Sequence, residues 1–162
     1  MKSERIGIKA RRRLSAMVVL SVLLFSFAYA DEAAPDSNRE RAAVKRVIDQ
    51  MERYYEARRV TRFLSLFSRR KFPRLISFKQ AVENDFNMNR QIRLRRTSER
   101  LTVSRGMAVH QATWQKQFMP MMISPHGGSR MKRVSGAVRI YLEKEGASWK
   151  VINLQGYPIF GL

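Results

Sequence analysis

The stretch VSGAVRIYLEKEGASWKVINL, residues 134–154, contains two runs of alternating apolar and polar residues separated by a glycine. Residues 134–142 and 149–154 both alternate with a period of two, which is typical of strands that bury one face. Between them, Glu145-Gly146-Ala147 is typical of a tight hairpin turn. The stretch therefore predicts two antiparallel strands joined by a short turn.

Two more runs with the same period precede this hairpin. Residues 107–118, MAVHQATWQKQF, are expected to form one long strand. Its alternation places five residues on one face: Ala108, His110, Ala112, Trp114 and Phe118. An earlier strand is predicted over residues 92–103, with an irregularity around 97–100. Gly106 is expected to form a turn, and residues 119–131, with two prolines and two glycines, a loop.

Three helices are predicted ahead of the strands. Ser37, followed three residues later by Glu40, has the pattern of a capping box, so a helix is expected to begin there. Its apolar residues at spacings of three and four are Val44, Val47, Ile48, Met51, Tyr54 and Tyr55. Shorter helices are predicted over residues 60–67 and 77–86. Helices followed by antiparallel strands predict an α+β domain with the helices packed on one face of a curved sheet.

The first thirty residues have the pattern of a secretory signal peptide. Six basic residues precede an apolar run, residues 14–30, that ends in Ala28-Tyr29-Ala30. We expect cleavage after Ala30, a short linker over 31–36, a single domain over 37–162, and a periplasmic or secreted location. A retained membrane anchor is the alternative, although seventeen residues are at the short limit for spanning a bilayer.

The composition excludes several classes of site. The 162 residues include 32 basic and 13 acidic side chains, a formal charge of +19. Without residues 1–30, 26 basic and 12 acidic side chains remain, so the basicity belongs to the domain itself. The absence of cysteine excludes disulfides, thiolate metal sites and cysteine nucleophiles, and two histidines leave little for a histidine metal site. We therefore predict no metal and no cofactor.

The order of elements and several short motifs resemble the nuclear transport factor 2-like superfamily, which includes SnoaL-like and steroid-isomerase-like proteins. YYEAR at 54–58 and FLSLF at 63–67 are similar to its long helix, turn and second helix; GMAV at 106–109 and GASWKVI at 146–152 are similar to its later strands. The resemblance covers about residues 40–156. It implies a cone of N-terminal helices on a curved antiparallel sheet, an apolar pocket, and a homodimer formed through the outer sheet face.

The resemblance implies a catalytic pattern that this sequence does not complete. An isomerase of this kind pairs a carboxylate base with a tyrosine or protonated acid that stabilises an enolate. Tyr54 or Tyr55 could supply the tyrosine, but residues 68–76, SRRKFPRLI, contain no acid, and Glu99 falls at the irregular point of its strand. We therefore favour a non-catalytic module that binds a small apolar ligand in its cone or a protein partner on its sheet.

An isomerase-like or cyclase-like enzyme acting on a small substrate is the first alternative. His110 could act as a base beside Tyr54 or Tyr55, or could be a hydrogen-bonded histidine on the partner-facing side of the sheet. Asp85, at the end of the third helix, is a second possible base, although such a residue is usually solvated or paired with arginine. Residues expected to contact a ligand, or else to pack in the core, are Tyr54, Tyr55, Phe63, Phe86, His110, Trp114 and Tyr141.

A basic envelope protein that binds anionic polymers or lipids is the second alternative. Arginine binds phosphate and carboxylate through two parallel hydrogen bonds, more specifically than lysine does. The residues expected to bind anions are Arg58, Arg59, Arg62, Arg69, Arg70, Lys71, Arg93, Arg95 and Arg96. Because we expect export, the predicted partners are anionic envelope components or an acidic protein, and intracellular nucleic acid is not expected.

Overall fold

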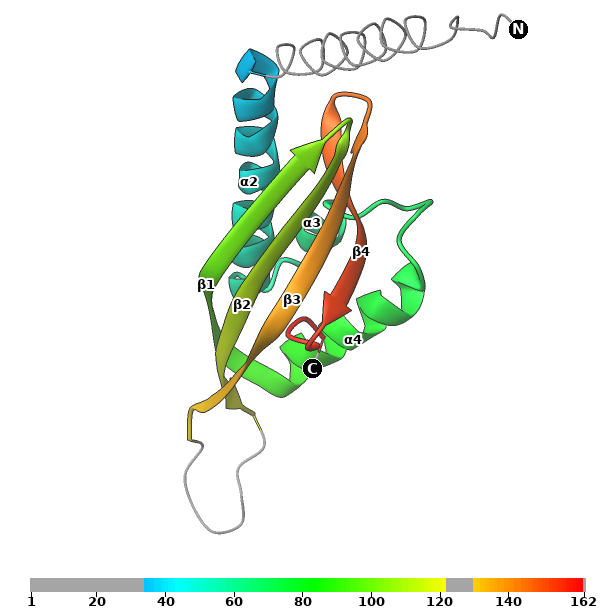
Figure 1. The fold of residues 1–162 in the computed structure, drawn as a ribbon. Coiled ribbons are helices and arrows are strands. Elements are labelled where there is room, and N and C mark those ends of the chain that lie inside the picture. The colour runs from blue at the N-terminus through cyan, green and yellow to red at the C-terminus, as the bar shows by residue number, and fades with distance from the viewer. Residues whose placement is uncertain (1–33, 122–129, 162) are drawn as a thin grey trace, which may run out of the picture. The chain divides into compact units, whose positions relative to one another are not determined.

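The computed structural model describes residues 34–121 and 130–161 (Figure 1). The predicted signal peptide 1–30, residues 31–33 of the predicted linker and most of the predicted loop 119–131 lie outside the described residues. The elements are α2 (Ala34–Glu56), α3 (Val60–Leu64), α4 (Leu75–Met88), β1 (Asn89–Ser104), β2 (Met107–Pro120), β3 (Lys132–Glu145) and β4 (Ser148–Gly156). None of the described helices is long and apolar enough to cross a membrane.

Helix α2 begins earlier than the sequence pattern indicates. The helix starts at Ala34, so Ser37 lies within it and not at its N-terminal cap. Glu40 does not serve a capping box either, because its carboxylate accepts hydrogen bonds from Lys144 Nζ at 2.5 Å and Trp149 Nε1 at 2.7 Å. These contacts attach α2 to β3 and β4. The acid at position 40 therefore stabilises tertiary packing.

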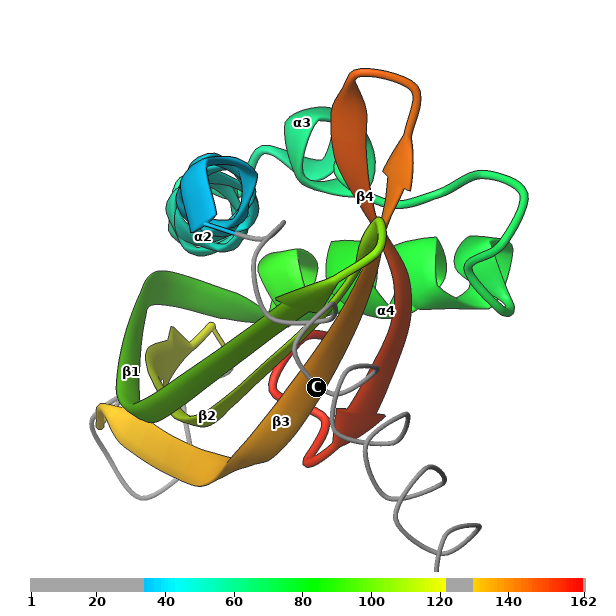
Figure 2. The same ribbon diagram turned by 45° about the horizontal axis from the view of Figure 1, so that its top comes forward.

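The four strands form one antiparallel sheet in the order β1-β2-β3-β4, as predicted. The three helices lie on one side of the curved sheet, which we call its inner face (Figure 2). Alternate residues of β2 from Ala108 to Lys116 are buried there. Helices on one face of a curved antiparallel sheet confirm the predicted α+β architecture.

The register of the sheet shifts at three places, between Arg90 and Arg93, between Thr97 and Arg100, and between Tyr141 and Leu142, and these shifts change which residues face inward. In β1 the register shifts between Thr97 and Arg100, at the predicted position. In β4, Val151 pairs with Leu142 and Asn153 with Tyr141, which leaves Ile152 as an extra residue. Such a bulge breaks the alternation. Leu154 consequently pairs with Ile140 on the inner face, where strict alternation from Val151 would have placed Asn153.

The second helix is also shorter than predicted. It ends at Leu64, and Phe67 instead forms a parallel bridge with Val151 of β4. Val151 donates its N–H to Leu66 O, and Ser68 donates its N–H to Val151 O. This bridge brings the segment after α3 to the edge of the sheet.

Residues 157–161, which we call the strap, turn back from β4 onto the inner face. Gly156 allows this turn: its φ is +105°, and a Cβ there would lie 2.2 Å from Ala137 O. Ile159 and Phe160 are 1% and 6% exposed. The strap ends with the Gly161 N–H donating to the Tyr55 hydroxyl at 2.7 Å. It therefore covers the middle of the inner face, an arrangement that no periodicity in the sequence indicates.

Candidate functional site

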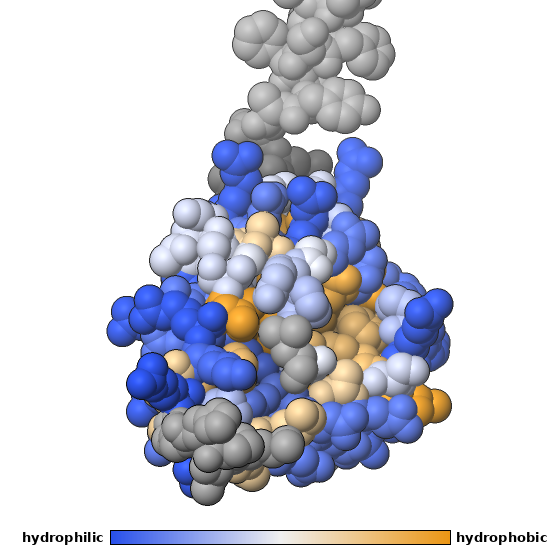
Figure 3. Space-filling view, turned by 90° about the horizontal axis from the view of Figure 1, so that it is seen from below, coloured by the Kyte–Doolittle hydropathy of each residue, from blue (hydrophilic) through white to orange (hydrophobic). Residues whose placement is uncertain are grey.

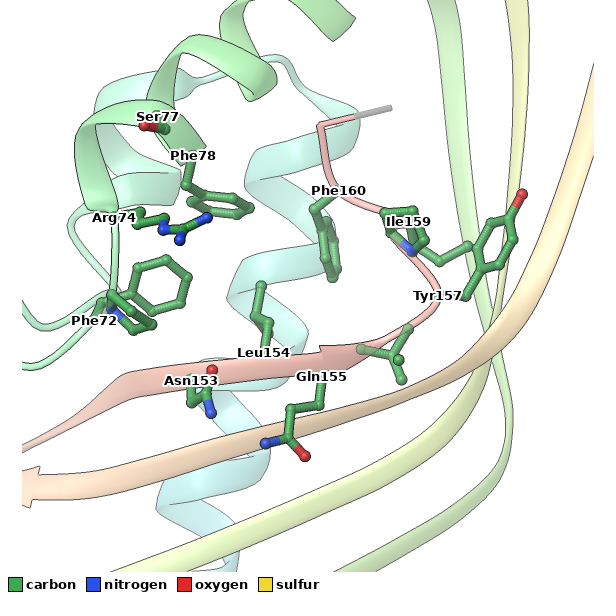
Figure 4. A pocket seen from close by; sticks show the side chains of 14 residues that line it. Phe72, Arg74, Ser77, Phe78, Asn153, Leu154, Gln155, Tyr157, Ile159 and Phe160 are labelled. Carbon is green, nitrogen blue, oxygen red and sulfur yellow. The ribbon is translucent and has the colours of Figure 1, made fainter.

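A pocket of about 390 Å³ opens between the start of α4, strand β4 and the strap (Figure 4). We call it the α4–β4 pocket. Its apolar lining residues are Phe72, Phe78, Val138, Leu154, Ile159 and Phe160. Polar side chains come from Arg74, Ser77, Asn153 and Gln155, and Tyr157 adds an aromatic ring with a hydroxyl group. Seen from below, the end of the domain is largely hydrophilic with a band of apolar residues across it (Figure 3).

Local structure at the start of α4 places Arg74 at this pocket. Arg74 precedes the helix in a left-handed conformation, with φ of +52° and no side-chain cap. A non-glycine residue in this region is strained, and such residues gather at functional sites. Figure 4 shows Arg74 on the same side of the pocket as Phe72 and Phe78. Arg74 is the one charged side chain among the described residues that line the pocket.

The aromatic residues expected to contact a ligand lie elsewhere. Tyr55, Phe63 and Trp114 are completely buried, and Phe86 is 4% exposed. The rings of Tyr55, Phe63 and Phe86 pack edge to face, with centroids 4.7–5.1 Å apart. Phe160 of the strap covers Tyr55 and Trp114, at centroid distances of 5.0 and 5.1 Å. These four residues, expected to contact a ligand or else to pack in the core, are core residues.

The other two predicted aromatic contacts do not reach the α4–β4 pocket either. Tyr54 is partly buried on α2 and packs against the core. Tyr141 pairs with Val109 and Asn153 on the outer face of the sheet, and its hydroxyl donates to Gln155 Oε1 at 3.0 Å. The aromatic residues that do line the pocket, Phe72, Phe78, Tyr157 and Phe160, were missed. Phe78 falls within the helix predicted over residues 77–86, but nothing local connects it with the strap.

Asp85 is buried in a hydrogen-bonded network, so the expectation that it is solvated or paired with arginine is wrong. Its carboxylate lies 2.5 and 2.6 Å from Lys116 Nζ, and both side chains are completely buried. It also accepts hydrogen bonds from the Tyr55 hydroxyl and from Asn89 Nδ2. Burial raises the pKa of Tyr55, and the charge of Asp85 adds to this effect. Burial lowers the pKa of Lys116, and Asp85 opposes that shift.

Tyr55 belongs to this network and His110 does not. The structure therefore does not support the prediction that His110 acts as a base together with Tyr55. Tyr55 donates to Asp85, whereas His110 contacts Glu99. Trp114 lies between the two groups along β2: its ring contacts His110 at a centroid distance of 6.4 Å and Phe160 on the other side. Lys116 was missed, although its position in the period-two pattern of residues 107–118 puts it on the same inner face as His110.

The bulge in β1 determines where Glu99 lies, which strict alternation along the strand could not predict. Thr97 pairs with Thr113 and Arg100 with Gln111, so Ser98 and Glu99 both oppose Ala112. Ser98 has φ of +54°, as expected where a bulge redirects the chain. Glu99 Oε2 thereby lies 3.1 Å from His110 Nε2. The irregularity noted in the sequence is the feature that brings this carboxylate to His110.

Glu99 and His110 line a second pocket, of about 310 Å³, between α2 and β1. His110 is 3% exposed, and burial lowers its pKa. Because a carboxylate only accepts hydrogen bonds, Nε2 of the neutral ring carries the hydrogen, and Nδ1 is an acceptor. Nδ1 is enclosed by protein atoms and has no hydrogen-bond partner in the described part of the chain. The ring therefore does not present a free basic nitrogen to the pocket.

The predicted anion-binding residues fall into three separate groups. Arg96 points inward, where its guanidinium meets Asp49 and Glu52 at 2.7 Å and Glu99 at 3.5 Å, so its charge is already neutralised. Around α3, Arg58 donates to Phe86 O and Lys71 pairs with Glu143 at 2.5 Å. Four arginines around α3 are exposed and have no ion-pair partner within residues 34–121 and 130–161: Arg59, Arg62, Arg69 and Arg70. Arg93 and Arg95 lie on the outer face of the sheet.

Comparison with known proteins shows the fold. The sequence matches no protein-family model and no curated protein. A nuclear transport factor 2-like superfamily protein from Salmonella enterica has a similar structure, with a TM-score of 0.64, 10% identity, and coverage of 75% of this chain and 92% of that protein. A putative scytalone dehydratase from Novosphingobium aromaticivorans is also similar, with a TM-score of 0.63, 13% identity, and coverage of 74% of this chain and 84% of that protein.

A third similar structure is Bd1075 from Bdellovibrio bacteriovorus. Its TM-score is 0.61 at 11% identity; the match covers 78% of this chain and 44% of that protein, so this chain spans less than half of its length. At these identities the likeness establishes architecture, because one fold can carry unrelated activities. The cone fold expected from the sequence motifs is thus confirmed.

Proposed function

On the premise that this chain has the nuclear transport factor 2-like fold, we propose that it is a non-catalytic module that binds a small apolar ligand bearing an anionic group. The α4–β4 pocket carries this proposal. Three phenylalanine rings and aliphatic side chains line it, and Arg74 is its one charged group among the described residues. Its volume of about 390 Å³ lies in the range of ligand pockets, which are mostly apolar with a few placed polar groups.

The polar lining residues define the chemistry of the expected ligand. The Arg74 guanidinium suits a carboxylate or phosphate, which it can bind through two parallel hydrogen bonds. Phe72, Phe78 and Leu154 suit an aliphatic or aromatic body. An amphipathic acid with a compact apolar part satisfies both requirements.

The positions of the acid–base residues support binding over catalysis. Asp85 and Lys116 neutralise one another in the core, and Glu99 with His110 lines a different pocket. No Asp, Glu, His or Lys is among the described residues that line the α4–β4 pocket. Of the side chains that usually transfer protons, the Tyr157 phenol is the one among the described residues of this pocket, so neither a carboxylate nor an imidazole is placed there to act as a base.

Thermal melts with decanoate, decanol and decylamine test this proposal. Decanoate is expected to raise the Tm even at high salt, because a ligand bound only by the native state stabilises it in proportion to occupancy. Ser77→Trp, which fills the pocket mouth, should abolish the shift. Arg74→Asn should reduce the shift with decanoate and leave that with decanol, and Arg70→Asn, outside the pocket, is the matched control. If Ser77→Trp binds decanoate as the wild type does, the ligand site lies elsewhere.

A proton-transfer enzyme is the second candidate function, and the Glu99–His110 pair favours it. The carboxylate holds the imidazole at 3.1 Å beside the pocket between α2 and β1, and His110 would act as a general base there after a turn of the ring that brings Nδ1 to the pocket. Proteins of similar structure are named as a putative scytalone dehydratase and a hexachlorocyclohexane dehydrochlorinase. An activity that His110→Ala abolishes, without a change in Tm, would establish this function in place of the first.

We further propose export and dimerisation. Intact mass measurement on protein from the periplasmic fraction should give a chain that begins at Asp31. Light scattering at tens of micromolar should give the mass of a homodimer. A retained N-terminal segment or a monomeric mass would contradict the respective proposal.

A further inference from the structure

The outer face of the sheet carries aligned arginine and glutamine residues in successive cross-strand rows. The first two rows are Arg93–Gln117–Arg133 and Arg95–Gln115–Ser135. The fourth row crosses all four strands and consists of Arg100, Gln111, Arg139 and Gln155. Directly paired residues share a face, so these side chains all project from the same side. The pattern arises only when the strands are placed in register.

This face holds no acidic residue over five consecutive rows. In the five rows from that of Arg93 to that of Thr102, the outer-face residues are arginine, glutamine, threonine, serine and small or apolar residues. The last row also contains Tyr141 and Asn153. The five arginines are exposed, and none has an ion-pair partner among residues 34–121 and 130–161. The face is thus a fixed cationic surface with amide side chains between the charges.

A shallow depression of about 210 Å³ lies in the fourth row. Gln111, Ala137, Arg139 and Gln155 line it. Tyr141 donates its hydroxyl to Gln155 Oε1, which leaves the Gln155 amide nitrogen to donate outward. Ala137 provides a small floor, so a ligand group can approach the Arg139 guanidinium between two amide side chains.

We propose that this face binds an acidic polysaccharide, with a uronate carboxylate in the depression against Arg139 and neighbouring hydroxyl groups on Gln111 and Gln155. Guanidinium groups bind carboxylates in a two-point geometry, and glutamine amides both donate to and accept from hydroxyl groups. With strands about 4.8 Å apart, the fourth row spans about 14 Å, long enough for more than one sugar ring. Its arginines lie outside the α4–β4 pocket, although Val138, Gln155 and Gly156 line both the depression and that pocket.

The composition of the face fits other occupants less well. A membrane surface would be met by apolar or interfacial aromatic side chains, and single-stranded nucleic acid by several aromatic rings that stack on bases. Tyr141 is the one aromatic residue in the five rows. A second copy of the chain on this face, the interface that the family resemblance implies, would set arginines opposite arginines, which costs free energy unless an anion lies between them. The proposed homodimer is therefore expected to use another surface.

Isothermal titration of the purified protein with a short oligogalacturonate tests this proposal, with a neutral maltooligosaccharide as the reference ligand. The variant Arg100→Gln/Arg139→Gln should weaken oligogalacturonate binding at least tenfold. The variant Arg62→Gln/Arg69→Gln removes the same charge from around α3 and should change binding less than threefold. Arg139→Lys keeps the charge and loses the planar guanidinium, so it should also weaken binding several-fold.

Equal losses in the two double variants would overturn the proposal, because they would indicate attraction by net charge alone. Tighter binding of a single-stranded oligonucleotide or of anionic lipid vesicles, lost in Arg100→Gln/Arg139→Gln, would assign the face to that partner instead. Both double variants alter exposed side chains, and a Tm equal to that of the wild type confirms that they fold. Decanoate binding at the α4–β4 pocket should be unchanged in both.

Discussion

Lys116 Nζ lies 2.6 Å from Oδ1 and 2.5 Å from Oδ2 of Asp85, and both side chains are completely buried. Lys116 also lies over the rings of Tyr55 and Phe118, at 5.5 and 5.1 Å from their centroids. Such a pair links α4 to β2 at the centre of the cone. Each charge is compensated by the other, because both side chains are buried away from water.

Replacing one member of this pair should be strongly destabilising. Lys116→Met leaves the Asp85 carboxylate buried without a counter-charge, which costs about 3–5 kcal/mol of unfolding free energy. Urea unfolding measures this loss. Asp85→Leu/Lys116→Met should be more stable than Lys116→Met, because the double variant removes both charges.

A surface lysine provides the control for that comparison. Lys79 pairs with Glu83 at 3.7 Å, and its side chain is 53% exposed. Lys79→Met should leave stability almost unchanged, because exposed ion pairs contribute little. Equal effects of the two lysine substitutions would show that the buried pair is not a stabilising link.

Phe160 should be both a core residue and the floor of the α4–β4 pocket. Phe160→Ala removes a ring that contacts Tyr55, Phe63 and Trp114, so it should cost about 3–5 kcal/mol. The space left should extend the pocket toward Tyr55, and indole should raise the Tm of this variant more than that of the wild type. Ile76→Ala is the control, since Ile76 is 76% exposed and should matter little. An indole effect equal in both proteins would argue against a continuous pocket.

Gly161 should tolerate a side chain less well than Gly146 does. Both have positive φ, +77° and +60°, so alanine adds a backbone penalty of roughly 1–2 kcal/mol at either position. At Gly161 the new Cβ would also lie 2.9 Å from Ala81 Cβ, whereas at Gly146 nothing lies within 4 Å. Gly161→Ala should therefore lose more unfolding free energy in urea than Gly146→Ala. Matching losses would mean that the strap shifts without cost.

His110 should make the domain less stable in mild acid. Burial lowers its pKa in the folded state, so between that pKa and about 6.5 the unfolded chain binds more protons. Unfolding free energy should fall as pH drops below about 6.5, by at most about 1.4 kcal/mol per pH unit, and level off below the folded-state pKa.

The difference between wild type and His110→Gln isolates this contribution. Glu99, Arg96 and Asp49 face His110, and Glu52, whose pKa burial raises, titrates nearby. These groups are present in both proteins, so their effect largely cancels in the difference. A difference that does not change between pH 7.5 and 5 would show that His110 does not lose protonation on folding.

Periodicity predicted most of the fold, and its failures share a physical cause. The strands and helices follow from spacings of two and of three to four residues, because each element buries one face. The start of α2 at Ala34 was missed because Ser37 and Glu40 do not cap the helix. The end of α3 and the bulge at Ile152 were missed because the bridge of Phe67 to Val151 and the pairing of β4 with β3 decide them. A local sequence pattern carries no information about those tertiary contacts.

The candidate sites were harder to predict than the fold. Asp85 and Lys116 carried no local signal for pairing, being 31 residues apart. Glu99 was visible only as an acid in an irregular stretch, and its contact with His110 depends on a bulge that redirects its side chain. The α4–β4 pocket joins residues from the start of α4 to residues of the strap, segments that have no common period.

The sequence by itself determined the class of the fold, the inward face of β2 and β3 and the basic character of the domain, because hydrophobic periodicity and charge are properties of neighbouring residues. Only the tertiary structure decided which charges neutralise one another, which aromatic rings are core, and which arginines stand aligned on a face without acids. These outcomes depend on strand register and on the path of the strap. Both are set by contacts between residues that lie far apart in the chain.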